Sequence, residues 1–337
     1  MAERADGEQP GKVSGDTGKP IGLGHPSLRA WLDVTRLSNL PTVFSNVLTG
    51  LMLGFMAGAL TCGLPEASPP DHVLLWRLFI GGGRLVLIAS ACFYMAGMTL
   101  NDVLDRAYDR EQRPERPIPS GRLNARAAAI AVVAFNIVGL LVMMLGFGMR
   151  ATLFALALVA AIIGYNALHR RFAAAVLLMG AVRGLLYFVA AAAMALVVNA
   201  AFWRVTLPFA VILTLYVAAV TYLARRENDA VVGHRALLAW TLPVLVAMGV
   251  LSVAPNTLTM VVMTAIIGLA MLLWLGRCAR LVAAQPPATK PAVMGWLAGL
   301  CLIDAYFLAL MGRPAFAGAA ILCFAATLLW QRRVMAT

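Results

Sequence analysis

Charged side chains are scarce in this sequence. Asp, Glu, Lys and Arg make up 12% of its 337 residues, about half of the roughly 25% that is usual in soluble globular proteins. Hydrophobic residues make up 61%, where about 45–50% is usual. A soluble fold cannot bury that much apolar surface, so the composition excludes a cytosolic enzyme, a disordered protein and a disulfide-stabilised scaffold. It predicts an all-α, polytopic transmembrane helical bundle.

Acidic residues and lysines are few as well. The chain has 15 Asp and Glu against 27 Lys and Arg, a net charge of +12, and only three of the basic residues are lysines. In a soluble protein this excess would suggest a nucleic-acid partner. In a membrane protein, basic residues in short loops orient the helices, so we expect a lipid bilayer and no nucleic acid. The five cysteines lack metal-site spacing and are interpreted as packing residues.

The chain divides into a polar tail and an apolar remainder. Residues 1–27 contain no apolar stretch, which predicts a disordered cytoplasmic tail rather than a signal peptide. Residues 28–337 form the predicted transmembrane domain. Most of its apolar stretches have about 18–24 residues, enough to cross a bilayer core of about 30 Å. About ten spans are predicted, with nine as the alternative, at 38–60, 78–101, 125–147, 151–168, 172–194, 205–224, 236–253, 257–276, 291–311 and 314–331.

Basic residues are distributed unevenly between the two sides of these spans. With ten spans, 21 of the 27 Lys and Arg fall on the side of the N-terminal tail. Four fall on the opposite side, namely Arg77, Arg150, Arg204 and Arg313. Since cytoplasmic loops are enriched in Lys and Arg, both termini are predicted to be cytoplasmic, in the cell inner membrane.

Five of the fifteen acidic residues lie close together after the second predicted span. At about 100° per residue, Asp102, Asp105 and Asp109 fall within a wedge of about 60° if the helix continues past the membrane edge. Three carboxylates on one face repel one another, so a cation must compensate them. Mg²⁺ is one candidate, because it binds one or two carboxylates together with substrate phosphates. Arginines in a purely structural salt-bridge face are the other.

The segment that follows is rich in proline and arginine. Residues 110–122 contain three prolines, one glycine and four arginines. The prolines and the glycine predict a rigid turn rather than a helix. Arginines bind phosphate in a bidentate manner. Carboxylates, a metal and arginines at a membrane surface suit a diphosphate whose apolar tail lies in the lipid.

The same segment resembles a known motif. Asn101-Asp102-x-x-Asp105-x-x-x-Asp109, followed by Arg113-Pro-x-Arg116-Pro-Ile-x-Ser120-Gly121, is similar to the first aspartate-rich motif of the UbiA superfamily of intramembrane prenyltransferases. Further segments similar to the family are Arg36-x-x-Asn39-x-Pro41 with Asn46, Tyr165-x-x-x-His169-Arg170, and Gly180-x-x-Arg183-Gly184. The resemblance covers residues 30–310.

This resemblance implies a helical bundle around a central cavity. It also implies Mg²⁺-dependent transfer of a polyprenyl group from a polyprenyl diphosphate to a small-molecule acceptor, usually aromatic in the family. The implied Mg²⁺ ligands and catalytic residues are Asp102, Asp105 and Asp109, supported by Asn101. The implied substrate-binding residues are Asn46, Arg113, Arg116, Tyr165, His169, Arg183, Tyr222, Arg225 and Arg226.

One family feature is missing. The second aspartate motif is replaced by Tyr222-Leu-Ala-Arg225-Arg226-Glu227-Asn228-Asp229, which lacks the paired aspartates. Either the two arginines supply the charge of a second metal, or the donor or acceptor is unusual, or transfer is lost. A non-catalytic binding partner for a lipid diphosphate is therefore one alternative function. A secondary transporter is another, disfavoured because the acids cluster at a helix end rather than at mid-membrane.

Overall fold

The computed structural model describes residues 28–63, 70–195, 197–225, 257–284 and 288–335, together with Leu238, Thr241 and Val246. The regular elements within these residues are all helices. Eight of them are long and apolar enough to cross a membrane, which confirms the predicted all-α membrane protein. They are α2 (Leu40–Thr61), α4 (Gly83–Leu104), α6 (Ala125–Leu168), α7 (Val176–Met194), α8 (Ala200–Ala224), α10 (Leu258–Ala283), α11 (Thr289–Leu310) and α12 (Pro314–Met335).

Helix α6 turns back on itself and accounts for two predicted spans. Gly148 has a left-handed φ of 74° in an otherwise helical run of 44 residues. Gly139 packs against Phe93 and Ile162 packs against Gly97, although these two partners are only four residues apart on α4. In a straight helix, Gly139 and Ile162 would be separated by about 34 Å. The chain therefore reverses at Gly148, and the predicted spans 125–147 and 151–168 are its two arms.

Most other predicted spans coincide with a helix. Two predicted segments lie outside the described residues, and one predicted span is divided. The span 236–253 and the tail 1–27 lie outside the described residues, apart from the three isolated positions named above. The span predicted at 78–101 is divided, since α3 (Asp71–Ile80) ends before α4 begins at Gly83. Residues 81–83 are three consecutive glycines, which weaken a helix at that point.

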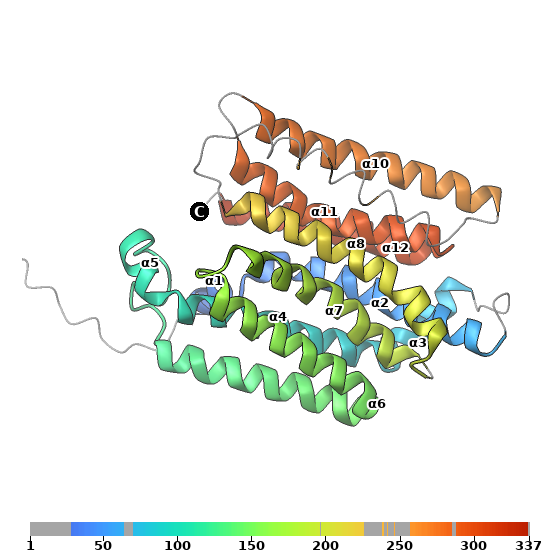
Figure 1. Ribbon diagram of the computed structural model, residues 1–337, viewed down its shortest axis with the longest axis horizontal. Helices are drawn as coiled ribbons and strands as arrows, with labels where there is room; N and C mark the ends of the chain where they lie inside the picture. Colours follow the sequence, from blue (N-terminus) through green and yellow to red (C-terminus); the bar gives the residue numbers. More distant parts are fainter. Residues whose placement is uncertain are drawn as a thin grey trace, which may run out of the picture.

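Small residues bring the inner helices together. Helices α2 and α11 are the most buried of the candidate spans, while α6 and α10 lie at the outside (Figure 1). A Cβ atom at Gly54 of α2 would collide with the backbone of Ala191 on α7. Gly180 and Gly184 of α7 make equally close approaches to Thr214 on α8. These close approaches between helices replace the hydrophobic driving force that lipid does not supply.

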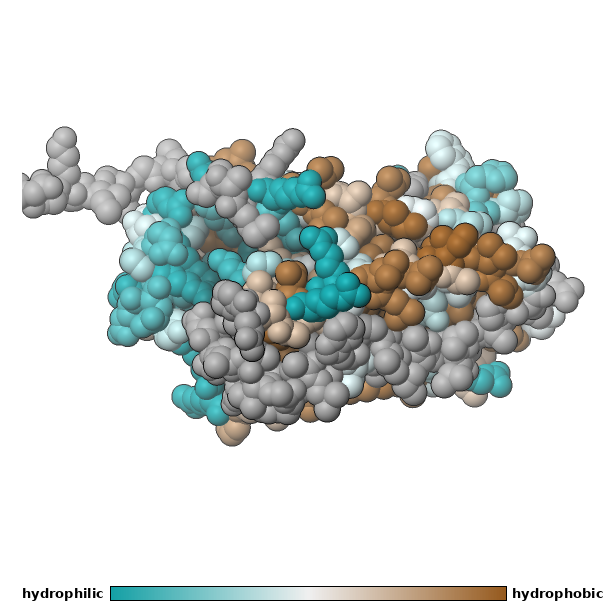
Figure 2. Space-filling model, turned by 90° about the horizontal axis from the view of Figure 1, so that it is seen from above, coloured by the Kyte–Doolittle hydropathy of each residue, from teal (hydrophilic) through white to brown (hydrophobic). Residues whose placement is uncertain are grey.

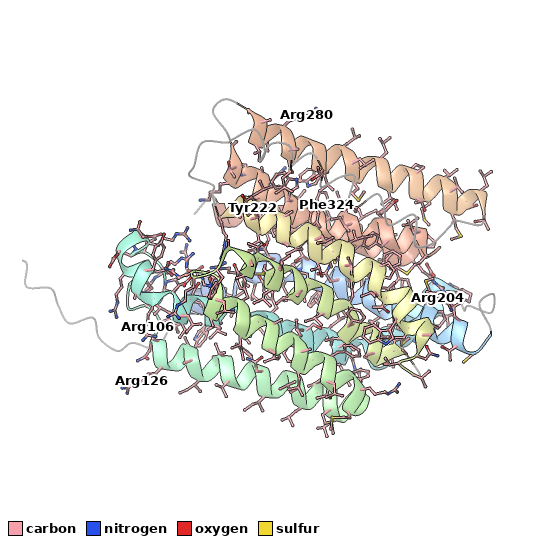
Figure 3. The ribbon with its side chains drawn as sticks, viewed as in Figure 1. Arg106, Arg126, Arg204, Tyr222, Arg280 and Phe324 are labelled. Carbon is pink, nitrogen blue, oxygen red and sulfur yellow. The ribbon has the colours of Figure 1, made fainter. Side chains whose placement is uncertain are left out.

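Polar residues gather at one end of the bundle. The end that carries α5 (Arg106–Gln112), which we call the α5 end, is hydrophilic, and the middle of the visible face is apolar (Figure 2). Arg106 and Arg126 lie at the α5 end, whereas Arg204 lies at the opposite end (Figure 3). This separation matches the two sides to which the sequence assigns these arginines.

Candidate active site

The three predicted aspartates lie where α4 gives way to α5. Asp102 is in the last turn of α4, Asp105 stands at the junction with φ −82° and ψ 0°, and Asp109 is in α5. The α-helix is interrupted at Asp105, so the condition for placing all three carboxylates on one continuous helical face is not met. All three remain buried, with exposed fractions of 4%, 8% and 1% in chain order. The break divides the carboxylates into two groups that pair with different cations.

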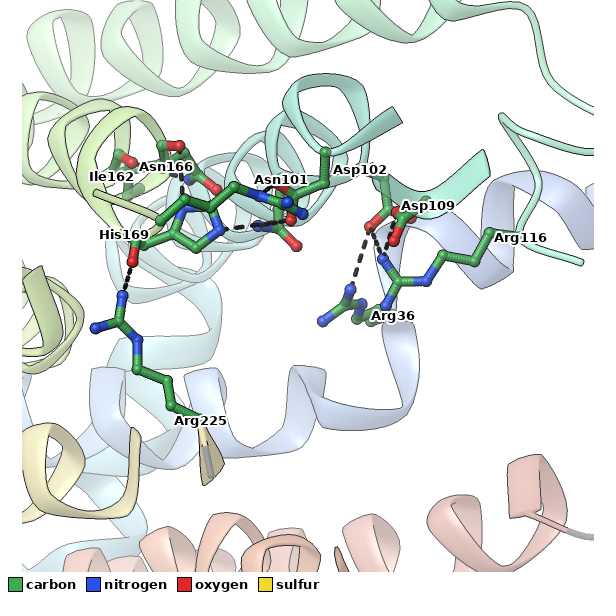
Figure 4. A network of polar contacts seen from close by, with 11 residues as sticks. Arg36, Asn101, Asp102, Asp109, Arg116, Ile162, Asn166, His169 and Arg225 are labelled. Atoms are coloured by element: carbon green, nitrogen blue, oxygen red, sulfur yellow. Dashed lines mark hydrogen bonds and ion pairs between the residues drawn. The ribbon is translucent and has the colours of Figure 1, made fainter. Parts of the chain in front are cut away.

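The first group is formed by Asp102, Asp109 and two arginines (Figure 4). Arg116 Nη1 donates to Asp109 Oδ2 at 2.7 Å and to Asp102 Oδ1 at 3.4 Å. Arg36 Nη2 donates to the same Oδ1 of Asp102 at 3.1 Å. Arg116 therefore contacts both buried carboxylates, and Arg36 contacts that of Asp102 as well. The sequence predicts Arg116 in this place, whereas Arg36 appears there only within a motif of the resemblance.

Arg36 has an unusual backbone. It is the one non-glycine residue with a positive φ, 48°, in the described part of the chain. This conformation costs roughly 1–2 kcal/mol for an L-residue. Its carbonyl oxygen accepts a hydrogen bond from Tyr94 OH at 2.9 Å, which helps to hold the turn between α1 (Leu28–Thr35) and α2. Backbone strain of this kind is common at functional sites. Here the strained turn places the side chain of Arg36 next to Asp102.

The second group surrounds Asp105. Arg170 Nε donates to Asp105 Oδ1 at 2.6 Å, and Asn101 Nδ2 donates to Oδ2 at 3.3 Å. His169 Nε2 lies 3.5 Å from that Oδ2, and its ring stacks on Tyr165. Burial alone would raise the pKa of Asp105, but the hydrogen bonds from His169 and Arg170 outweigh it and lower the pKa to about 2. Asp105 is therefore a fixed anion that orders the C-terminal end of α6.

A cavity of about 140 Å³ opens beside both groups, between α4, α6 and α7. Its polar lining includes Arg36, Asn101, Tyr165 and Arg183. The rest is mostly apolar or aromatic, contributed by Phe93, Tyr94, Gly97, Met98, Ile162, Met179 and Val182. The cavity therefore has cations and an amide together with an apolar wall, as a prenyl diphosphate requires.

Arg183, which lines this cavity, is held by hydrogen bonds to two residues of α2. Its Nη1 donates to Asn46 Oδ1 at 2.9 Å, and its Nη2 donates to Thr42 Oγ1 at 3.1 Å. Asn46 Nδ2 in turn donates to Asp304 at 2.7 Å. The side-chain amide of Asn46 therefore lies between Arg183 and Asp304 and hydrogen-bonds to both.

Tyr222, Arg225 and Arg226 are the predicted substrate-binding residues that lie at the end of α8 or beyond it. Arg225, the residue that follows α8, donates to the backbone carbonyl oxygens of His169, Phe172 and Ala173. Its guanidinium is therefore bound to the connection between α6 and α7. Tyr222 lies in the last turn of α8, and Arg226 lies outside the described residues. Arg113 is exposed at the end of α5.

Arg36, Arg170 and Tyr94 belong to the site although the sequence does not assign them to it. The first two stand inside segments that resemble the family, next to or near assigned residues. Their position inside the motifs that resemble the family was the available signal. Tyr94 carries no sequence signal, because its role depends on the path of residues 36–39 around α4.

The carboxylates are compatible with a metal ion, though not as the predicted set of three. Within the described residues, no three His, Cys, Asp or Glu side chains lie close enough together to hold a metal. Asp102 and Asp109, however, reach one shared cation, Arg116 Nη1. Mg²⁺ uses one or two carboxylates and fills its other positions with water and phosphate oxygens. A two-carboxylate site therefore fits this pair, and Asp105 is engaged elsewhere.

Comparison with known proteins gives a consistent match. A model of the UbiA prenyltransferase family matches residues 51–294. The digeranylgeranylglyceryl phosphate synthase of Methanothrix thermoacetophila is 36% identical over 111 residues, which are 33% of this chain and 34% of that protein. The protein of the same name from Methanosarcina barkeri is 32% identical over 104 residues, 30% of this chain and 33% of its own length. The chain thus matches about a third of these relatives.

Solved structures agree in fold. The apo structure of a UbiA homologue from Aeropyrum pernix K1 superposes with a TM-score of 0.55 at 18% identity, over 83% of this chain and 96% of the other. A structure described as digeranylgeranylglyceryl phosphate synthase gives a TM-score of 0.50 at 16% identity, over 85% and 98% of the two chains. At these identities the likeness concerns the helical fold.

Proposed function

Because this chain belongs to the UbiA prenyltransferase family, we propose that it transfers a prenyl group from a prenyl diphosphate to a small-molecule acceptor within the membrane. The observation that carries this proposal is the buried pair Asp102 and Asp109, which shares Arg116 and faces a second arginine, Arg36. The pair stands at one end of a membrane-spanning helix, beside a cavity with an apolar wall.

The residues of the proposed site have different roles. Arg36 and Arg116 bind the oxygens of the diphosphate, because guanidinium groups form strong bidentate contacts with phosphate. Asp102 and Asp109 would hold Mg²⁺, which supplies further positive charge to the departing diphosphate. Asn101 supports Asp105 through its amide and reaches the cavity. Positive charge fixed around the leaving group stabilises the negative charge that develops on its oxygens.

The reaction exchanges one bond for another. The bond between the allylic carbon and the diphosphate oxygen breaks, and its electrons leave with the diphosphate. A nucleophilic atom of the acceptor forms a bond to the allylic carbon and then loses its proton. Phe93, Met98 and Ile162 line the cavity and exclude water, which would otherwise trap the cation-like carbon.

The relatives suggest which substrates to test first. Their name, digeranylgeranylglyceryl phosphate synthase, specifies a product with two geranylgeranyl groups on glyceryl phosphate. We propose a geranylgeranyl diphosphate donor and test the geranylgeranyl ether of glyceryl phosphate first as acceptor, with aromatic acceptors such as 4-hydroxybenzoate in parallel.

Purified protein in lipid nanodiscs tests the proposal. The protein is incubated with geranylgeranyl diphosphate, each acceptor and Mg²⁺, and prenylated products are identified by mass spectrometry. Product formation that requires Mg²⁺ and disappears in Asp102→Asn is expected. Donor binding without product for any acceptor would favour a non-catalytic lipid-diphosphate binding protein. An absence of donor binding would contradict both functions.

The membrane location follows from the fold, and its orientation is part of the proposal. The chain is an integral, multi-pass membrane protein by the length and composition of its helices. We propose that the α5 end faces the cytoplasm, because most of the basic residues are assigned to that side. A water-soluble diphosphate head group would then reach the aspartates from the cytoplasm.

A further inference from the structure

Asp304 is a carboxylate at the centre of the bundle, away from the aspartates of the proposed active site. It lies in α11, the most buried candidate span, and its exposed fraction is 0%. A charged side chain inside a membrane span is expensive and usually marks a functional interaction. Three donors converge on it: Ser45 at 2.6 Å and Asn46 at 2.7 Å reach Oδ2, and Tyr187 reaches Oδ1 at 2.5 Å. Donors on both oxygens are the pattern that suits an ionised carboxylate.

Asn46 connects Asp304 to Arg183, which lines the cavity. Its side-chain amide has one donor end and one acceptor end. Because the Nδ2 end donates to Asp304, the Oδ1 end must face Arg183, where it accepts the hydrogen bond at 2.9 Å. A reversed amide would place its NH₂ group against a guanidinium that can only donate. The carboxylate on α11 thus fixes the orientation of an amide on α2, and the amide fixes a guanidinium on α7.

Arg183 is suited to receive an anion. It lines the cavity, whereas Asp304 is not among the lining residues. The described residues place no carboxylate oxygen within ion-pair distance of it. Its two contacts to Asn46 and Thr42 use two of the five N–H donors of the guanidinium. Arg36 and Asn101 line the same small cavity, so a diphosphate bound there lies near Arg183 as well.

We propose that Asp304 is a positioning residue, which orients Arg183 toward the bound prenyl diphosphate through the side-chain amide of Asn46. This proposal rests on the proposed function, because it assigns Arg183 to the donor. Asp304 itself touches no substrate. Its negative charge also offsets that of Arg183 without neutralising it by direct contact, which leaves the guanidinium available to an incoming anion.

Two substitutions separate positioning from packing. Asp304→Asn keeps the shape of the side chain but removes its negative charge and one of its two acceptor oxygens, so the acceptor that fixes the orientation of the Asn46 amide is weakened. Tyr187→Phe is the matched control, since it removes a donor from the other oxygen of Asp304 and leaves the contact with Asn46 in place. Binding of geranylgeranyl diphosphate is measured by isothermal titration calorimetry with Mg²⁺ present. We expect Asp304→Asn to weaken binding at least tenfold and Tyr187→Phe to change it less than threefold.

A double-mutant cycle with Arg183 gives the decisive comparison. In an Arg183→Gln background, Asp304→Asn should weaken donor binding no further, because the group that it positions is already gone. Equal losses in both backgrounds, or equal losses in Asp304→Asn and Tyr187→Phe, would overturn the proposal. If Asp304→Asn does not fold, Asn46→Ala replaces it, since it removes the intermediate amide and leaves Ser45 and Tyr187 on the carboxylate. Wild-type protein that fails to bind the donor would instead contradict the proposed function.

Discussion

The Nη1 atom of Arg116 lies 2.7 Å from Oδ2 of Asp109, across the proline-rich turn that leads from α5 to α6. The turn returns the chain to the end of α4, so that a residue fourteen positions after Asp102 contacts its carboxylate. On the outer side of the turn, Arg122 forms an exposed ion pair with Asp33 of α1, at 3.2 Å. This turn therefore holds Arg116 beside the carboxylates of Asp102 and Asp109.

Removal of Arg116 should damage the site more than removal of its neighbour in the same turn. In Arg116→Ala, two buried carboxylates lose their shared cation, and uncompensated buried charge is strongly destabilising. We expect kcat/KM for geranylgeranyl diphosphate to fall at least tenfold. Arg122→Ala is the control, because its partner Asp33 is exposed and surface ion pairs contribute little. Similar losses in the two variants would contradict the assignment of Arg116.

The pairing of Asp105 predicts how stability depends on pH. Its pKa is about 2 in the folded protein, below the ordinary value of about 3.9. A lowered folded-state pKa adds stability above the unfolded pKa, and this contribution is lost as the pH falls through the folded value. The melting-temperature difference between wild type and Arg170→Gln should therefore be constant above about pH 5 and shrink below about pH 4.

Arg171→Gln provides the comparison for this measurement, because Arg171 is the exposed neighbour of Arg170 and makes none of the contacts with Asp105. Its melting temperature should follow that of the wild type across the pH range. A difference for Arg170→Gln that grows as the pH falls toward 2 would have the wrong sign for this ion pair.

Two glycines of α2 should respond differently to the same change. A Cβ atom at Gly54 would lie 2.3 Å from the carbonyl oxygen of Ala191, and one at Gly58 would meet nothing within 4 Å. Overpacking costs typically about 1–3 kcal/mol, so Gly54→Ala should lower the melting temperature in detergent. Gly58→Ala should leave it unchanged or raise it slightly, since alanine favours the helix. Equal melting temperatures would show that α2 and α7 are not in backbone contact.

The orientation of the bundle can be tested with reporter fusions. The distribution of Lys and Arg predicts that a reporter fused after Thr337 reads as cytoplasmic and that one inserted near Glu66 reads as external. Alkaline phosphatase and green fluorescent protein report the two compartments in opposite senses and control for each other. An external C-terminus would mean that the number of spans is odd.

The sequence predicts the parts of the site that are close together in the chain. The stretch from Asn101 to Gly121 carries carboxylates, prolines and arginines in one run, and the structure brings Asp102, Asp109 and Arg116 together as that run suggests. It does not predict that the helix breaks at Asp105, because a periodic pattern contains no information on where a helix ends without a glycine or proline.

Contacts between helices that are far apart in the sequence could not be predicted, because they depend on how the helices pack. Asp304, Asn46 and Arg183 come from three helices, and their meeting depends on how α2, α7 and α11 rotate about their own axes. That rotation is set by close contacts such as Gly54 with Ala191. The sequence places Arg183 in a segment that resembles the family, but the Asn46 amide between Arg183 and Asp304 is visible only in the packed structure.

The Mg²⁺ dependence of donor binding is the sharpest test of the proposed site, in which Asp102 and Asp109, with Arg36 and Arg116, bind Mg²⁺ and a prenyl diphosphate. Geranylgeranyl diphosphate is titrated into the protein by calorimetry at increasing Mg²⁺ concentrations, for wild type and for Asp109→Asn. We expect Mg²⁺ to tighten donor binding in the wild type along a simple saturation curve, and we expect this tightening to be lost in Asp109→Asn while the protein remains folded. Donor binding that is independent of Mg²⁺, or equally Mg²⁺-dependent in both proteins, would contradict the proposed site.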